Sequence, residues 1–185
     1  MGTRRRRKDS KKDKEYARQA FEKERRRNLH AEPGPHDFVL VLEGLKPHFN
    51  VAKLFRSADA FGAKEVHLIS IPQFDPRPGV GSFKWVPAHF HEDFESCYQM
   101  LKDDYQLYAL DTEGAELLGR GEFPKKSAFI LGHEERGISD AVKKKSDIKR
   151  IQIPQFGRVQ SLNVSVAGSL VMYEYVRQHA ADASD

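Results

Sequence analysis

The sequence predicts an α/β domain, a parallel sheet with helices on both faces. Two observations carry this prediction. Short runs that are apolar at almost every position recur along the chain, as in strands buried on both faces. Helical patterns separate these runs, which is typical of strands joined by crossover helices. A chain of 185 residues is long enough for one such domain with a full core and an appendage.

The elements follow in order along the chain. A short helix is expected at 12–28, before a linker at 31–36 that contains two prolines and a glycine. The prolines and glycines of residues 72–85 predict a long loop without regular structure. The expected strands are 38–45, 65–71, 105–111, 127–132 and 150–154. The expected helices are 50–62, 91–104, about 138–145, and one from Ser161 onward that is apolar on nearly every side and therefore buried all round.

Composition indicates a globular protein for which nothing demands an oxidising compartment, and we expect a cytoplasmic location. Hydrophobic residues make up 39% and charged residues 31% of the chain. Cys97 is the single cysteine, so no intrachain disulfide can form. No apolar run is long enough to span a bilayer, and the basic N-terminus lacks the apolar core of a secretory signal.

Charge is divided unevenly between the two ends of the chain. Residues 1–30 contain 13 Lys and Arg against 5 Asp and Glu, a balance of +8, whereas residues 31–185 contain 18 against 22, a balance of −4. We therefore expect a basic arm and linker at 1–36 and one domain at 37–185. A basic arm suits a polyanion such as RNA, because each contact with a phosphate releases a counterion. A solvated tail and a localisation signal are the alternatives.

An α/β domain binds its ligand at the carboxyl ends of the strands, but the two common phosphate-binding motifs are absent. No G-x-G-x-x-G follows the first strand, and no G-x-x-x-x-G-K-[ST] occurs in the sequence. A dehydrogenase of the Rossmann type and a P-loop NTPase are both disfavoured.

Three other stretches could carry chemistry. In NVAKLFRSADAFG, the pattern places Arg56 opposite the apolar face and makes Asn50 an N-cap, so pattern alone favours solvated surface for the arginine. In FILGHEERGIS, Gly132 allows close approach of a ligand, whereas Glu134 is expected to be an exposed loop acid. In IPQFGRVQSLNVSV, Ser161 is the expected N-cap, beside free N–H groups that can also bind a ligand.

No metal site is expected. On a strand, His89 and His91 would point to opposite faces, and no further ligands at zinc spacing accompany them. Cys97 has no adjacent histidine or basic residue, so we expect a buried or half-buried thiol rather than a nucleophile.

Taken together and in this order, the three stretches resemble the SPOUT superfamily, and within it the TrmH (SpoU) family of RNA ribose methyltransferases. FNVAKLFRSADAFG, LGHEERGIS and IPQFGRVQSLNVSV are similar to the first, second and third motifs of that family. The resemblance covers residues 38–179. It implies a C-terminal trefoil knot, a homodimer with the active site at the subunit interface, and S-adenosylmethionine as cofactor. By motif matching, the cofactor contacts are Leu110, Gly132, Ile153, Ser161 and Leu162.

The resemblance also implies the reaction, methyl transfer to a ribose 2′-hydroxyl, with Arg56 as the key catalytic residue. Because the guanidinium pKa lies above about 12, we expect Arg56 to hold the phosphate and stabilise the developing alkoxide rather than act as a base. The resemblance places Asn50, Glu134, Ser161 and Asn163 around it as orienting and positioning groups. Gln155 and Gln160 depart from the common motif but remove no catalytic position.

The length of the arm favours tRNA as substrate. Only about 36 residues precede the first strand, too few for a separate RNA-binding domain with its own core. An rRNA substrate is the alternative within the same chemistry. The competing class is a non-catalytic RNA-binding module with the same fold.

Overall fold

The computed structural model describes the backbone of residues 3–180 and the side chains of residues 11–180. Seven strands form one sheet in the order β3-β2-β1-β6-β4-β7-β5, and every neighbouring pair is parallel. The strands are β1 (Val39–Glu43), β2 (Glu65–Ile69), β3 (Ala88–His91), β4 (Gln106–Leu110), β5 (Glu116–Leu117), β6 (Ser127–Leu131) and β7 (Lys149–Gln152). The helices are α1 (Thr3–Asn28), α2 (Phe49–Ala60), α3 (Phe94–Leu101), α4 (Asp140–Lys143) and α5 (Val164–His179).

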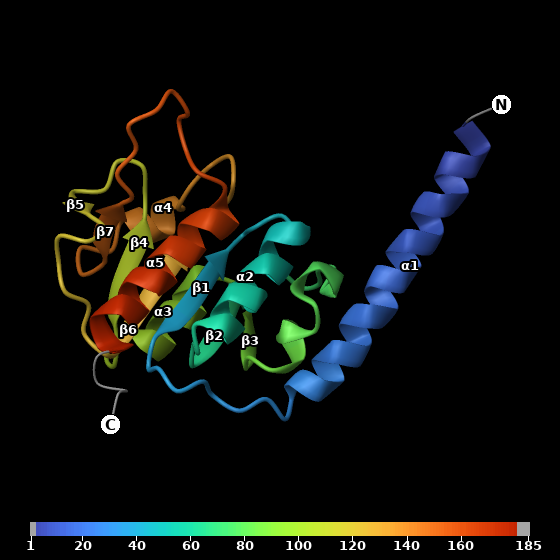
Figure 1. Cartoon of the computed structure of the whole chain (residues 1–185), viewed down its shortest axis with the longest axis horizontal. Coiled ribbons are helices and arrows are strands. Elements are labelled where there is room, and N and C mark those ends of the chain that lie inside the picture. The colour runs from blue at the N-terminus through green and yellow to red at the C-terminus, as the bar shows by residue number, and fades with distance from the viewer. Residues whose placement is uncertain (1–2, 181–185) are drawn as a thin grey trace.

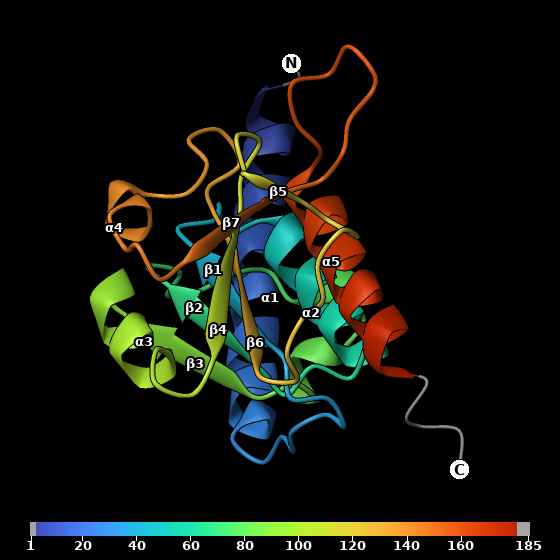
Figure 2. The same ribbon diagram turned by 90° about the vertical axis from the view of Figure 1, so that its left-hand side faces the viewer.

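Helices cover both faces of the sheet, as predicted. Figure 2 shows α2 and α5 on one side of the strands and α3 and α4 on the other. The alternation of side chains along β1 supplies both cores. Leu40 and Leu42 pack in the core under α2 and α5, whereas Val39 and Val41 pack in the core under α3 and α4.

Helix α5 lies very close to α2 and β6, and Gly168 makes this approach possible. A Cβ atom at this position would lie 2.8 Å from Cδ1 of Leu131 and would collide with the side chain of Leu54. The hydroxyls of Ser57 on α2 and Ser169 on α5 hydrogen-bond at 2.8 Å beside this contact. The start of α5 is therefore fixed relative to the sheet.

Helix α1 is longer than the predicted 12–28, and its last turns dock on the body while its N-terminal part extends away from it (Figure 1). Phe21 is 4% exposed and lies against Phe74 and Phe83. At the end of the helix, the amide of Asn28 donates to the carbonyl of Val86 at 2.7 Å, and its Oδ1 accepts from the N–H of Ala88 at 3.2 Å. Phe21 and Asn28 thus anchor one end of the arm.

The structure adds two strands to the predicted set. Strand β3 is a partly buried edge strand with the polar sequence AHFH, and β5 has two residues, so neither contains an apolar run. The expectation that residues 72–85 exclude regular structure is wrong, because two 3₁₀ turns, Arg77–Gly79 and Ser82–Lys84, form around the buried Phe83. The placement of His89 and His91 on opposite faces is also wrong, since residues two apart on a strand share a face.

Two predicted helix caps are each wrong by two residues. Helix α2 begins at Phe49 behind His48, so Asn50 is not its N-cap. Helix α5 begins at Val164 and is capped by Asn163, whose Oδ1 accepts the N–H of Ser165 at 2.9 Å. The side chains of Asn50 and Ser161 are therefore not used as helix caps and can serve another role.

Helix α5 is not buried all round, because one apolar stripe faces solvent. Val166, Leu170 and Tyr173 are 47%, 38% and 56% exposed, and they follow one another at helical spacing. No helix within residues 3–180 combines the length and the apolar character needed to cross a membrane.

Candidate active site at the carboxyl ends of the strands

A cavity of about 370 Å³ opens where β4, β6 and β7 end and the loop before α5 begins. Part of its wall is formed by Leu110 and Leu131, the last residues of β4 and β6, and by Ile151, the next-to-last residue of β7. Parallel strands bring their carboxyl ends to one edge of the sheet, where open α/β folds bind ligands. The volume lies in the range of about 300–1,000 Å³ that is common for small-molecule sites.

All five residues expected to contact the cofactor line this cavity: Leu110, Gly132, Ile153, Ser161 and Leu162. Gly132 needs its lack of a side chain, because a Cβ atom there would collide with the backbone of Gly137 and Ile138. This close approach follows from the backbone hydrogen bonds that pair His133 with Gly137. The loop after β6 is thereby folded tightly against one side of the cavity.

Gln155 is a residue of the cavity that sequence reasoning set aside as a departure from the motif. Its Oε1 atom is buried and has no hydrogen-bond partner among the described residues, although Gln155 lines the cavity. A buried acceptor without a partner is costly unless a ligand donates to it. The sequence signal that could have identified Gln155 as a site residue is its position in the loop before α5.

Glu134 also lines the cavity, but it is not the free loop acid that pattern alone suggests. Its Oε1 accepts from Nδ2 of Asn50 at 2.9 Å, and its Oε2 accepts from the backbone N–H of Lys46 at 3.1 Å. Partial burial acts to raise the pKa of Glu134, but its hydrogen bonds to Asn50 and to backbone N–H groups, together with the nearby His133, outweigh burial and lower the pKa below its ordinary value. Glu134 is therefore held as a carboxylate.

Asn163 joins the same network from the start of α5. Its Oδ1 is used by Ser165, so its Nδ2 is free to donate to Oδ1 of Asn50 at 3.2 Å. Asn50 then donates to Glu134, which fixes the orientation of both amides. Three residues from the three motifs, far apart in the sequence, thus form one directional chain of hydrogen bonds beside the cavity.

Arg56 is the one predicted catalytic residue that the structure does not bring to the cavity or to this network. It lies on the exposed side of α2, as the helical pattern predicts. Within residues 11–180 its guanidinium makes no hydrogen bond or ion pair, in contrast to Arg77 and Arg177, which are both paired with carboxylates. Arg56 is thus available to an external anion.

Comparison with known proteins identifies the family. Residues 37–173 match the SpoU rRNA Methylase family. The tRNA (guanosine(18)-2′-O)-methyltransferase of Thermus thermophilus is 35% identical over 149 residues, which cover 77% of this chain and 75% of that protein. The matched region begins at the first strand and contains all three motifs.

Solved structures share the fold. One, which concerns the 2-OH methylation of C/U34 on tRNA, superposes with a TM-score of 0.71 at 28% identity and covers 80% of this chain and 99% of that chain. The SpoU methyltransferase AviRb from Streptomyces viridochromogenes, in complex with AdoMet, gives a TM-score of 0.72 at 26% identity over 83% of this chain and 62% of that one. The chain therefore belongs to the SpoU methylase family.

Proposed function

We propose that this chain transfers a methyl group from S-adenosylmethionine to a ribose 2′-hydroxyl of RNA, and that its substrate is tRNA. The observation that carries the proposal is the cavity at the strand ends, to whose wall the second and third motifs contribute, with the first motif joined to it through Asn50. The similarity to a tRNA 2′-O-methyltransferase supports both the reaction and the choice of RNA.

The residues of the cavity fit S-adenosylmethionine. Apolar side chains of Leu110, Ile153 and Leu162 suit the faces of an adenine ring, and the free acceptor of Gln155 suits an amino group. Glu134 provides a negative charge at the wall, where a cationic ligand is favoured. When bound, the cofactor supplies an electrophilic methyl group to the reaction.

Arg56 is the proposed catalytic residue, acting on the RNA rather than on the cofactor. Its exposed guanidinium has no partner in the described part of the chain, so it can bind a phosphate through two parallel N–H groups. From there it stabilises the negative charge that develops on the 2′-oxygen as its proton leaves. Asn50 and Asn163 position the ribose at the mouth of the cavity, and Glu134 holds Asn50 in place.

A second copy of the chain is the proposed partner of the exposed apolar stripe on α5. Val166, Leu170 and Tyr173 form a continuous apolar surface, which Tyr173 extends to Phe61 at the end of α2. Arg56 lies on α2, which Phe61 caps at its C-terminal end, and we propose that a dimer formed through this surface brings Arg56 to the interface. The active site is then completed between two subunits.

The basic arm is the segment proposed to bind the phosphate backbone of the RNA. The basic helix α1 is anchored at Phe21 and Asn28, while its other end extends away from the body (Figure 1). A positively charged helix held at one end can follow phosphates outside the cavity. We propose a cytoplasmic location for the enzyme, where such RNA is available.

The proposal is tested with labelled S-adenosylmethionine and separate tRNA and rRNA fractions, followed by nuclease mapping of the labelled nucleotide. The expected result is incorporation into tRNA, at a ribose. Incorporation into rRNA alone would assign the alternative substrate. Cofactor binding without incorporation into either fraction would show a binding module rather than an enzyme.

A further inference from the structure

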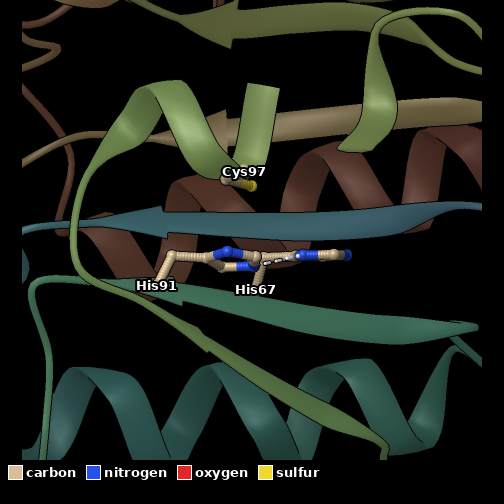
Figure 3. A group of neighbouring side chains, drawn as sticks. All are labelled: His67, His91 and Cys97. Carbon is tan, nitrogen blue, oxygen red and sulfur yellow. Dashed lines mark hydrogen bonds between the residues drawn. The ribbon is translucent and has the colours of Figure 1, made fainter. Parts of the chain in front are cut away.

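Three potential metal ligands meet on the face of the sheet covered by α3. His67 lies on β2, His91 on the edge strand β3, and Cys97 on α3 (Figure 3). One ligand atom from each lies within 4.8 Å of the others. His67 is fully buried, Cys97 is 1% exposed and His91 is half-buried, so this cluster is not a chance grouping of surface side chains.

The hydrogen bonds of His67 define which atom would bind a metal. Its Nε2 lies 3.1 Å from Oε1 of Glu65, a carboxylate that can only accept, so Nε2 carries the proton. The Nδ1 lone pair then faces Nε2 of His91 at 2.9 Å. A carboxylate that holds the outer nitrogen of a histidine while the inner nitrogen binds the ion is the common arrangement around metal-binding histidines.

The spacing suits a small tetrahedral ion. Two nitrogens bound to Zn²⁺ at about 2.0 Å lie about 3.3 Å apart, and a thiolate binds at about 2.3 Å. The distance between Nδ1 of His67 and Nε2 of His91 is within a few tenths of an ångström of that separation. The Sγ atom of Cys97 needs to move roughly 1 Å closer to the two nitrogens. Two imidazoles and one thiolate favour zinc over Mg²⁺ or Ca²⁺, which prefer oxygen ligands.

The charges around the cluster favour a cation. The carboxylate of Glu65 holds Nε2 of His67, and the carboxylates of Glu43 and Glu65 both act on Cys97. Asp93 and His89 are the other charged or titratable groups that act on His91. A dication offsets the surrounding negative charge and makes the thiolate the stable form.

We propose that Nδ1 of His67, Nε2 of His91 and Sγ of Cys97 bind one divalent ion of the zinc class, with water as the fourth ligand. On binding, the S–H bond of Cys97 breaks, its proton passes to water and an S–metal bond forms. His91 keeps one proton, which moves to its outer nitrogen. The ion ties the four-residue edge strand β3 and helix α3 to β2, and so has a structural role separate from methyl transfer.

The test is titration of metal-free full-length protein with Co²⁺ and Zn²⁺. The expected result is one Co²⁺ per chain, with the visible absorption of a tetrahedral ion and a thiolate charge-transfer band that Zn²⁺ removes. One proton is released per ion, so the affinity rises with pH. Thermal unfolding, followed in parallel, shifts upward with Zn²⁺.

Matched variants separate the proposed ligands from their neighbours. Cys97→Ser removes the charge-transfer band, and His91→Gln, at the half-buried edge, weakens binding by more than the ~10–100-fold typical of a residue that only supports a ligand. His89→Gln is the control, because His89 also hydrogen-bonds Glu65 but is no ligand, and it leaves the band in place. Absence of a thiolate band in the wild type, or equal affinities for the His91 and His89 variants, would overturn the proposal.

Discussion

Replacing Glu134 by glutamine tests the hydrogen-bond network beside the cavity. The carboxylate accepts from Asn50 at 2.9 Å and from the N–H of Lys46 at 3.1 Å. A glutamine has one acceptor oxygen, so its amide group must point at one of these two donors. One hydrogen bond to a charged acceptor is lost, and the NH₂ group of the glutamine then faces the N–H donor that its oxygen does not reach. Because Glu134 is partly exposed, we expect a loss of about 1–2 kcal/mol in the free energy of unfolding.

Glu135→Gln is the matched control, one residue further along the chain. Its side chain is 70% exposed and pairs with the ammonium group of Lys46 at the surface. An exposed ion pair contributes about 0–1 kcal/mol. Urea unfolding of both variants at pH 7 measures the difference. Equal losses, or a larger loss for Glu135→Gln, would refute the account of the network.

Three further predictions concern the pKa of Glu134, the docking of α1 and the exposed apolar stripe of α5. The hydrogen bonds lower the pKa of Glu134, so the stabilisation by its carboxylate is present above the ordinary value of 4.5 and is lost as the pH falls through the folded pKa. The difference in the free energy of unfolding between wild type and Glu134→Gln, measured in urea, should therefore disappear in acid. A difference that stays constant with pH would contradict this. Phe21→Ala should undock α1, which would appear as faster amide exchange around Phe83 and as a loss of up to about 3 kcal/mol in the free energy of unfolding. Tyr16→Ala is the control at a 63% exposed position, and it should change the free energy of unfolding by less than about 0.5 kcal/mol. Leu170→Arg should convert a dimer to a folded monomer in sedimentation, and a wild type that is already monomeric would remove the proposed interface.

The layered fold could be predicted from the sequence because buried parallel strands leave an apolar run. Strands β1, β2, β4 and β6 were found in this way, whereas in β7, which was also predicted, only Ile151 is buried. Strand β3 was missed because it is a short edge strand without an apolar run, and the wrong placement of His89 and His91 on opposite faces hid the histidine cluster. Pattern cannot show that His67 and Cys97 meet His91, since strand order and register bring them together.

The candidate site was only partly visible in the residues themselves. Glycine at 132 predicted the close approach of a ligand, but the close neighbour that the structure shows there is the backbone of Gly137 and Ile138. The roles of Asn50 and Asn163 depended on resemblance, because a polar residue near a helix start equally predicts a cap, and Asn163 is in fact both cap and network member. The trefoil knot implied by the family stays a prediction.

Methyl transfer by wild type and an Arg56→Ala variant tests the central claim most directly. Both are incubated with S-adenosylmethionine and unmodified tRNA, and the digested RNA is analysed by mass spectrometry for 2′-O-methylnucleosides. We expect the wild type to form one such nucleoside, and Arg56→Ala to form it at least ~100-fold more slowly while binding the cofactor with unchanged affinity. An Arg56→Ala variant with wild-type rate, or a methyl group on a base instead of a ribose, would contradict the account.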